Sequence, residues 1–545
     1  MRQEVRPCTP PFLVCRDFLD LPPSGRADAS SPLPLWQDSA AIRGGGSTTR
    51  RYGGRVRDDE LRRLLTESNP WWTAAARGAD PTTWVAGNRT LRERTRYELG
   101  YRAGILDDIA SVAPDGRLVV LTGPRRIGKS VALLDAAANL CTLPGVDPRQ
   151  VVYVPCDTMR GRDVTRTLTL GRMLTRSVDQ PKPRPRVWLF DEISMVSGWT
   201  SALKLARDTT PFGDDTVVVT GSRWAQSEDI QGNLLAGRAG SSGSHRIRQL
   251  LPMSFRDFLA AAYPGLPTVP VVNPAELQSE ASRWALDELQ FAVDELDLAW
   301  QDYLTCGGFP RAVFEHTRAG AVSDGYARDL HAWLRRDVDP DAPTNTTTTL
   351  LRGISERMSS PINLTSTAQD LGYSSRPTFT ARVDRLISTH AALRCNQVRD
   401  EGDRVVGAHY KLYLADPLLA WIPSIVSPGL PAPDFTRLTE SALGITLARA
   451  IEALDEGRWL SDDSVGYART ESNNEIDFAP VRVPIDGTHS TTVPIESKWV
   501  DTGWRGEARV IDGKYGRGIL ATKSVLDVDG DVWAVPAPLL ALMLA

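Results

Sequence analysis

The sequence RLVVLTGPRRIGKSVALLDAAANLC, residues 117–141, decides how the first half of this chain folds. It starts with an apolar run, passes through a loop bounded by two glycines, and ends in an amphipathic helical stretch. The loop, residues 123–130, fits the pattern G-x-x-x-x-G-K-[ST] without a departure. A buried strand, a glycine-bounded loop and a helix in this order predict a phosphate-binding loop.

The residues of this loop have separate predicted roles. The two glycines let backbone N–H groups curl around a phosphate at a helix N-terminus, where the helix dipole favours an anion. Lys129 is expected to reach the terminal phosphates of a nucleotide, and the Ser130 hydroxyl is expected to bind Mg²⁺. The predicted nucleotide contacts are Gly123, Pro124, Arg125, Arg126, Ile127, Gly128, Lys129, Ser130 and Val131.

Four continuous apolar runs follow one another at intervals of about thirty residues, which suits βαβ units. Strands that are buried on both faces have such runs, whereas half-buried strands alternate. The sequence therefore predicts an α/β core with a parallel sheet. The four runs are residues 118–121, 151–154, 187–190 and 217–219.

Acidic residues end the third apolar run. Asp191 is expected at the carboxyl end of its strand, where a carboxylate can hold Mg²⁺. Glu192 is then placed to orient or deprotonate an attacking water. A chain that only bound a nucleotide would not need Glu192, so the pair favours hydrolysis.

Two further residues are candidates near the phosphates, each with an equally simple alternative. Ser222 ends the fourth run and could sense the γ-phosphate, or it could be an ordinary turn serine. Arg238 lies in a glycine-rich loop and could supply charge to a phosphoryl-transfer transition state in cis or in trans. A solvated loop arginine is the competing interpretation.

Composition limits the class of protein. The chain has 545 residues, 41% of them hydrophobic and 24% charged, which is typical of a globular protein with several domains. A net charge of -4 argues against a wholly basic nucleic-acid coat. Six scattered cysteines without a C-x-x-C pair favour a reducing, cytoplasmic setting. We expect no membrane span, because no apolar run reaches eighteen residues.

Residues 1–56 are rich in Pro, Ser, Gly and Arg, which indicates a disordered tail or a mispredicted start.

The order of motifs resembles the AAA-type P-loop ATPases of bacteria and archaea that carry a C-terminal domain of unknown function. The motifs are GPRRIGKS, LFDEI, TGS, AGR, LPMSFRDFL and YLTCGGFPRAVF, the last at residues 303–314. The resemblance covers the chain from about residue 57, and the LPMSF and GGFP stretches are specific to the group. It implies a nucleotide-binding core with N-terminal helices over residues 57–262 and a helical lid over residues 263–345. It also implies a restriction-endonuclease-like domain, of the PD-(D/E)XK type, over residues 436–545.

Three helical stretches within residues 350–395 predict a winged helix-turn-helix, which we place at residues 346–424. The first turn of a recognition helix enters the major groove of DNA. The residues expected to face bases or phosphates are Arg376, Thr378 and Thr380, with Arg382 and Arg385 beside them. Winged helices also serve only as packing modules between domains, so DNA as a partner stays open.

A second candidate site lies near the C-terminus, where two predicted strands carry Asp477 and the run Glu496-Ser497-Lys498. Alternation along a strand places Glu496 and Lys498 on the same face. Asp477 and Glu496 could bind Mg²⁺ or Mn²⁺, while Lys498 activates the attacking water. Lysine is rare in this chain, at seven residues, which makes Lys498 more informative than usual. Glu440 is expected on the preceding helix, and an exposed cross-strand ion pair is the plain alternative.

Two functions follow from these patterns. The first is an ATPase that hydrolyses ATP with Mg²⁺ and couples hydrolysis to a nuclease-like, DNA-associated domain; a homo-oligomer is compatible with it. Its expected catalytic residues are Lys129, Glu192, Arg238, Asp477, Glu496 and Lys498. The second is a nucleotide-gated regulatory or interaction protein whose nuclease-like domain is inactive.

Overall fold

The computed structural model describes residues 57–176, 184–223, 245–340, 343–399, 402–454, 464–485 and 488–545. All of them belong to one compact unit, Val56–Ala545. The tail predicted over residues 1–56 and the candidate Arg238 lie outside the described residues.

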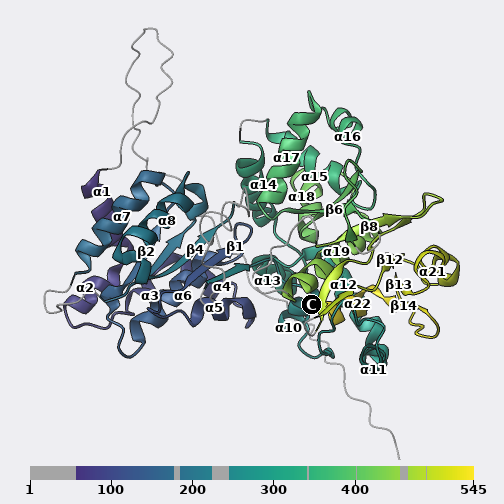
Figure 1. Cartoon of the computed structure of the whole chain (residues 1–545), viewed down its shortest axis with the longest axis horizontal. Coiled ribbons are helices and arrows are strands. Elements are labelled where there is room, and N and C mark those ends of the chain that lie inside the picture. The colour runs from purple at the N-terminus through teal and green to yellow at the C-terminus, as the bar shows by residue number, and fades with distance from the viewer. Residues whose placement is uncertain are drawn as a thin grey trace, which may run out of the picture. The chain divides into compact units, whose positions relative to one another are not determined.

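A five-stranded parallel sheet forms the core of the first half of this unit (Figure 1). Its order is β2-β3-β4-β1-β5, so β1, which leads into the glycine-bounded loop, lies between β4 and β5. Every residue of β1, β3 and β4 is buried, which explains the continuous apolar runs and confirms the four predicted strands. The strands are β1 Leu118–Thr122, β2 Val151–Pro155, β3 Val187–Asp191, β4 Thr216–Gly221 and β5 His245–Gln249.

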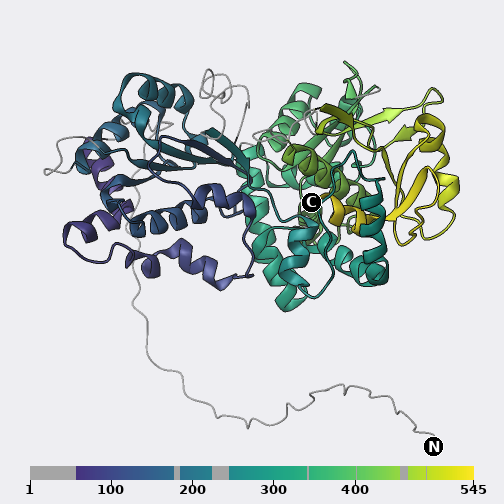
Figure 2. The same ribbon diagram turned by 60° about the horizontal axis from the view of Figure 1, so that its bottom comes forward.

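Helices cover both faces of this sheet, with α7 and α8 on one side and α6 on the other (Figures 1 and 2). The elements between the strands are α6 Lys129–Thr142, η2 Pro148–Gln150, α7 Gly161–Leu174, η3 Ile193–Met195, α8 Trp199–Thr209 and η4 Pro211–Asp214. The elements before β1 are α1 Asp58–Ser68, α2 Pro70–Ala76, α3 Trp84–Gly87, α4 Arg89–Arg96, η1 Gly104–Leu106 and α5 Asp107–Ala110. The indole N–H groups of Trp71 and Trp72 both donate to the Val151 carbonyl, at 3.0 and 2.8 Å, and so fasten α2 to β2.

Helices also dominate the segment after the sheet, where the resemblance implied a helical lid over residues 263–345. They are α10 Phe255–Ala262, α11 Glu280–Leu289, η6 Gln290–Ala292, α12 Val293–Cys306, α13 Pro310–Ala319 and α14 Asp324–Val338. The LPMSF and GGFP stretches meet here, because the Met253 N–H donates to the Gly308 carbonyl at 2.7 Å. A Cβ at Gly308 would overlap the Met253 backbone, so the close approach requires glycine. These contacts fix the start of α13.

Three helices and a two-stranded hairpin follow, in the order predicted for a winged helix-turn-helix. They are α15 Thr344–Ser355, α16 Leu364–Asp370, α17 Arg376–Ser388, β6 Ala392–Gln397 and β7 Tyr410–Leu414, and α18 Pro417–Val426 comes next. The hairpin does not stand alone, because β6 also pairs in parallel with β8, Gly466–Arg469, of the C-terminal region. With β9, Glu475–Ile476, they form a four-stranded sheet in the order β7-β6-β8-β9. Two of its strands precede the proline-rich stretch at residues 425–435 in the chain, and two follow it.

The C-terminal region combines a long buried helix with short strands. Its elements are α19 Phe435–Ala453, β8 Gly466–Arg469, β9 Glu475–Ile476, β10 Arg482–Ile485, β11 Thr488–Thr491, β12 Ile495–Ser497, α20 Trp504–Glu507, α21 Arg509–Tyr515, β13 Gly518–Thr522, β14 Val532–Pro536 and α22 Ala537–Leu544. The order β12-β13-β14 makes a parallel sheet, and an antiparallel bridge between Phe478 and Ile495 brings the end of β9 to β12. The restriction-endonuclease-like fold stays a prediction. Within the described residues, no helix is both long and apolar enough to cross a membrane.

Candidate functional site

The glycine-bounded loop joins β1 to α6 at the carboxyl edge of the sheet. Gly128 is the N-cap of α6 with φ +107°, and Gly123 has φ +155°. A Cβ at Gly123 would overlap the Leu250 carbonyl oxygen, which lies just after β5. Both positions therefore need glycine, for a positive φ in each and for close packing at Gly123.

Lys129, the first residue of α6, lies beneath this loop and is 4% exposed. Its ammonium donates to the carbonyl oxygens of Gly123 and Pro124, at 2.9 and 2.8 Å. It also lies 3.5 Å from a carboxylate oxygen of Glu192. Burial lowers the pKa of Lys129, while the neighbouring Glu192 charge opposes that shift. The lysine therefore joins the loop to the end of β3.

Asp191 ends β3 with both carboxylate oxygens held by hydroxyl groups. Oδ1 accepts from Thr220 at 2.8 Å, and Oδ2 accepts from Tyr153 at 2.8 Å. These bonds fix the carboxylate, and its charge acts on Lys129, the residue before Ser130 at the start of α6. Carboxylate and hydroxyl oxygens are the ligands that Mg²⁺ prefers, so Asp191 and Ser130 have the donor chemistry that suits this ion.

Glu192 has a left-handed backbone, with φ +54°, which turns its side chain toward the loop. Its Oε2 atom accepts from the Ser222 hydroxyl at 2.8 Å and from the Ser222 N–H at 3.1 Å. Burial alone would raise the pKa of Glu192. The Lys129 charge and the Ser222 hydrogen bond lower the pKa, and their effect is larger, so the net shift is downward. Ser222, predicted to sense the γ-phosphate, thus orients a carboxylate that is kept ionised.

A cavity of about 290 Å³ opens beside these residues. Its walls include the loop, Glu192 and three residues from the helical segment, Pro310, Arg311 and Tyr326. The Arg311 guanidinium lies over the rings of Tyr97 and Tyr326, each with its centroid at 4.8 Å, and pairs with Glu315 at 2.8 Å. Sequence reasoning missed Arg311, although it directly follows the GGFP stretch.

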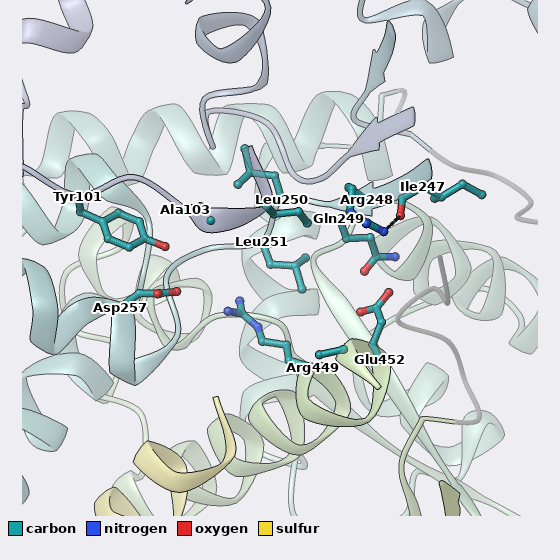
Figure 3. Close-up of a pocket in the computed structure, with 13 residues that line it drawn as sticks. Tyr101, Ala103, Ile247, Arg248, Gln249, Leu250, Leu251, Asp257, Arg449 and Glu452 are labelled. Atoms are coloured by element: carbon teal, nitrogen blue, oxygen red, sulfur yellow. Dashed lines mark hydrogen bonds between the residues drawn. The ribbon is translucent and has the colours of Figure 1, made fainter. Parts of the chain in front are cut away.

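A second cavity of about 270 Å³ adjoins the first and shares several of its walls, including Val131 and Pro310. Apolar residues such as Leu99, Leu106 and Leu250 contribute to its lining. Beyond it lies a third cavity of about 420 Å³ (Figure 3). Figure 3 shows Tyr101, Arg248, Asp257, Arg449 and Glu452 around this third cavity. Because Arg449 belongs to α19, the C-terminal region reaches the neighbourhood of the nucleotide loop.

Ion pairs connect the loop to the end of α14. Asp337, whose side chain is fully buried, pairs with Arg125 of the loop at 2.7 Å. It also pairs with Arg223, which directly follows Ser222, at 2.9 Å. A single carboxylate on α14 therefore joins the loop to the end of β4.

The next two residues of the chain connect the same end of α14 to α17. Asp339 pairs with Arg382, and the Val338 carbonyl accepts from Arg385 at 3.0 Å. His390, just after α17, lies 2.6 Å from the Thr122 hydroxyl at the end of β1. Two arginines predicted to assist DNA contact therefore serve in packing between parts of the chain.

The predicted C-terminal residues come together as expected from strand alternation. The Lys498 ammonium lies 2.8 Å from Glu496 Oε1, which confirms that these two side chains share a face. The Asp477 N–H donates to Glu496 Oε2 at 3.0 Å, and the Ser497 N–H donates to Asp477 Oδ2 at 2.9 Å. Burial raises the pKa of Glu496 to about 8, aided by the Asp477 charge and opposed by Lys498.

Lys411 of β7 also lies in this cluster, and sequence reasoning missed it. Its side chain is fully buried and contacts Glu440 at 2.8 Å, Glu475 at 2.7 Å and Asp477 at 2.6 Å. The Tyr413 hydroxyl donates to Glu440 at 2.9 Å. Among the residues that the structure describes, no group of three or more His, Cys, Asp or Glu side chains is arranged to hold a metal ion.

Comparisons with known proteins agree with the nucleotide site. A family model described as an AAA domain (AAA_14) matches residues 115–259, and a domain of unknown function (DUF8612) matches residues 297–422. Among solved structures, the Walker-type ATPase PABY2304 of Pyrococcus abyssi is similar at 17% identity and a TM-score of 0.34, covering 58% of this chain and 93% of that one.

Two other solved structures are less similar. The ORC2 protein of Aeropyrum pernix, in its ADPNP–ADP complexes, has 12% identity and a TM-score of 0.28, covering 59% of this chain and 93% of its own. A RuvB variant of Thermotoga maritima has 14% identity and a TM-score of 0.22, covering 62% of this chain and 91% of its own. No curated protein matches. The chain contains a P-loop ATPase domain of the AAA type, followed by a domain of unknown function.

Proposed function

We propose that the chain hydrolyses ATP with Glu192 as the residue that orients and deprotonates the attacking water. One observation carries this proposal: the Glu192 carboxylate stands in the cavity beside Lys129 and is fixed there by Ser222. A general base must be ionised and held within reach of the water. Lys129 and Ser222 supply both conditions for Glu192.

The adjoining cavities suit the parts of a nucleotide. The loop of residues 123–130 would hold the phosphates against backbone N–H groups at the start of α6. The apolar cavity lined by Leu99, Leu106 and Leu250 would take the base. Ser130 and Asp191 would hold Mg²⁺, which when bound neutralises charge on the phosphates.

Arg311 is the proposed contact from the helical segment. Its guanidinium reaches the cavity from α13 and is held in place by two aromatic rings and Glu315. An arginine in this position can stabilise charge that develops on the transferred phosphoryl group. Closure of the helical segment on ATP would bring Arg311 toward the γ-phosphate.

We further propose that hydrolysis is coupled to the winged motif, and the ion pairs at the end of α14 support this coupling. A nucleotide bound at the loop would compete for Arg125, which pairs with Asp337 in this structure. Loss of that pair would free the end of α14, and Asp339 would carry the change to Arg382 on α17. The helices of the winged motif would then act as a relay, which is the packing role weighed against DNA contact.

DNA contact stays a weaker candidate. Arg376 at the start of α17 is exposed, which supports it. Arg382 and Arg385 contact α14, which leaves fewer cations for DNA phosphates on this helix. The C-terminal region is compatible with a nuclease-like domain. It has the helix α19, the strands β8, β9 and β12, and a crossover to β13.

The test of hydrolysis measures steady-state ATP turnover of the full chain with Mg²⁺. We expect Glu192→Gln to reduce kcat at least a hundredfold while ATP still binds, because the substitution removes the base and keeps the shape. Lys129→Ala should instead weaken ATP binding. Glu67→Gln, in an exposed pair with Arg63 on α1, is the control and should leave kcat unchanged. Unchanged turnover in Glu192→Gln would refute the proposed role and favour a regulatory module.

A further inference from the structure

The carboxylate cluster of the C-terminal region already contains a buried cation. Three carboxylate oxygens, one each from Glu440, Glu475 and Asp477, lie 2.6–2.8 Å from the Lys411 ammonium. An ammonium has three N–H donors, so these three contacts use all of them. The Lys411 side chain is fully buried, and its charge is therefore balanced by these carboxylates alone and not by water.

The two carboxylates predicted to bind metal have all four oxygens engaged with groups of the chain. Asp477 accepts from Lys411 through Oδ1 and from the Ser497 N–H through Oδ2. Glu496 contacts Lys498 through Oε1 and accepts from the Asp477 N–H through Oε2. A divalent cation between these carboxylates would displace the ammonium or lie beside it, and like charges at such separation repel strongly.

We propose that the Lys411 ammonium takes the place of a divalent cation in this cluster, so that the C-terminal region folds and works without a metal. The residues therefore do not fit the metal that the nuclease-like resemblance implies. The domain would be a binding or signalling module whose carboxylates are held by an internal cation. This inference does not depend on the proposed ATPase function.

The choice of residue supports the same conclusion. The chain has 63 Lys+Arg, and only seven of these are lysines. A compact ammonium directs its three N–H donors at three converging carboxylates, whereas a larger, planar guanidinium spreads its five donors in one plane. Lys411→Arg should therefore disturb the cluster although it keeps the charge.

The experiment measures Mn²⁺ binding to the full chain without nucleotide, by electron paramagnetic resonance of free Mn²⁺. Binding at the cluster is defined as the component that Asp477→Asn removes. We expect no such component in the wild-type chain up to millimolar Mn²⁺. In Lys411→Met, the carboxylates lose their cation, and we expect one Mn²⁺ site to appear, with a Kd at least tenfold below the highest Mn²⁺ concentration at which the wild type shows none. Mn²⁺ should also raise the thermal midpoint of this variant and leave the wild-type midpoint unchanged.

Lys498→Met is the matched control. Lys498 is 38% exposed on its side chain and contacts Glu496, while Lys411 remains among the other carboxylates. We expect no new Mn²⁺ site in this variant. A new site here, equal to that in Lys411→Met, would show that general loss of positive charge is responsible and would overturn the proposal.

Two other results would overturn it. One is wild-type binding of Mn²⁺ that Asp477→Asn removes. The other is a folded Lys411→Met chain that binds no Mn²⁺ at the cluster. If Lys411→Met does not fold even with Mn²⁺, the double variant Lys411→Met/Glu440→Gln decides instead, because it removes one acidic charge together with the cation. Mn²⁺ binding in that variant supports the proposal, and its absence refutes it.

Discussion

The buried carboxylate of Asp337 allows a sharp test of the link between the nucleotide loop and α14. Its side chain is fully buried and pairs with Arg125 at 2.7 Å and with Arg223 at 2.9 Å. At an effective dielectric constant of about 20 and a charge separation of about 4 Å, each pair has a gross attraction of about 4 kcal/mol. Desolvation cancels part of this, and removal of one partner of a buried pair costs about 3–5 kcal/mol. Asp337→Asn should therefore lower the free energy of unfolding of the sheet and helical segment by about 3–5 kcal/mol.

The neighbouring arginine of the loop provides the control. Arg126 pairs with Asp329 at 3.4 Å, and both side chains are 44% exposed. Exposed pairs contribute about 0–1 kcal/mol, so Asp329→Asn should lose less than about 1 kcal/mol. Urea unfolding followed by circular dichroism measures both variants against the wild type. Equal losses in the two variants, or no loss in Asp337→Asn, would refute the reasoning.

Two further predictions concern the nucleotide cavity and the contact between β1 and α17. Arg311→Ala should lower kcat at least tenfold with a smaller change in KM, because the guanidinium is proposed to act on the transition state; a change confined to KM, in steady-state kinetics, would contradict that role. Burial, with the Lys129 charge, lowers the pKa of His390 to about 3 from 6.5. The neutral His390 ring therefore contributes fully to the free energy of unfolding at pH values well above 6.5, and this contribution is lost as the pH falls toward 3. From pH 7 to 5 the wild type should lose about 2 kcal/mol more than His390→Asn, measured by urea unfolding at each pH; equal losses would rule out His390 as the group.

The central sheet was the most predictable part of the fold. Strands buried on both faces need continuous apolar runs, and β1 to β4 have them. The fifth strand, with the sequence HRIRQ, was missed because it is an edge strand that carries polar residues. Arg248 on this strand pairs with Asp108, which precedes the sheet in the chain, and no local sequence pattern predicts such a pair.

The residues of the candidate sites also fall into two groups, those that a local sequence pattern predicts and those that it does not. The loop and Glu192 are marked by spacing alone, since the chemistry needs those residue types within a few positions. Asp337 and Lys411 carry no such mark, because their partners are distant in sequence: Lys411 and Asp477 are 66 positions apart. The scarcity of lysine drew attention to Lys498, and the same argument applies with more force to the fully buried Lys411.

The sheet shared by β6 and β8 has a consequence for dissecting the chain. The proline-rich stretch at residues 425–435 looks like a natural point at which to cut. A cut there would separate β6 from β8 and leave two open strand edges, which favour aggregation. It would also part Lys411 from Glu440, Glu475 and Asp477, so one fragment would keep a buried cation and the other its counter-charges. The proline-rich stretch therefore connects two parts of one folded unit. Fragments cut at this stretch would each be incomplete, and their properties would not be those of an intact domain.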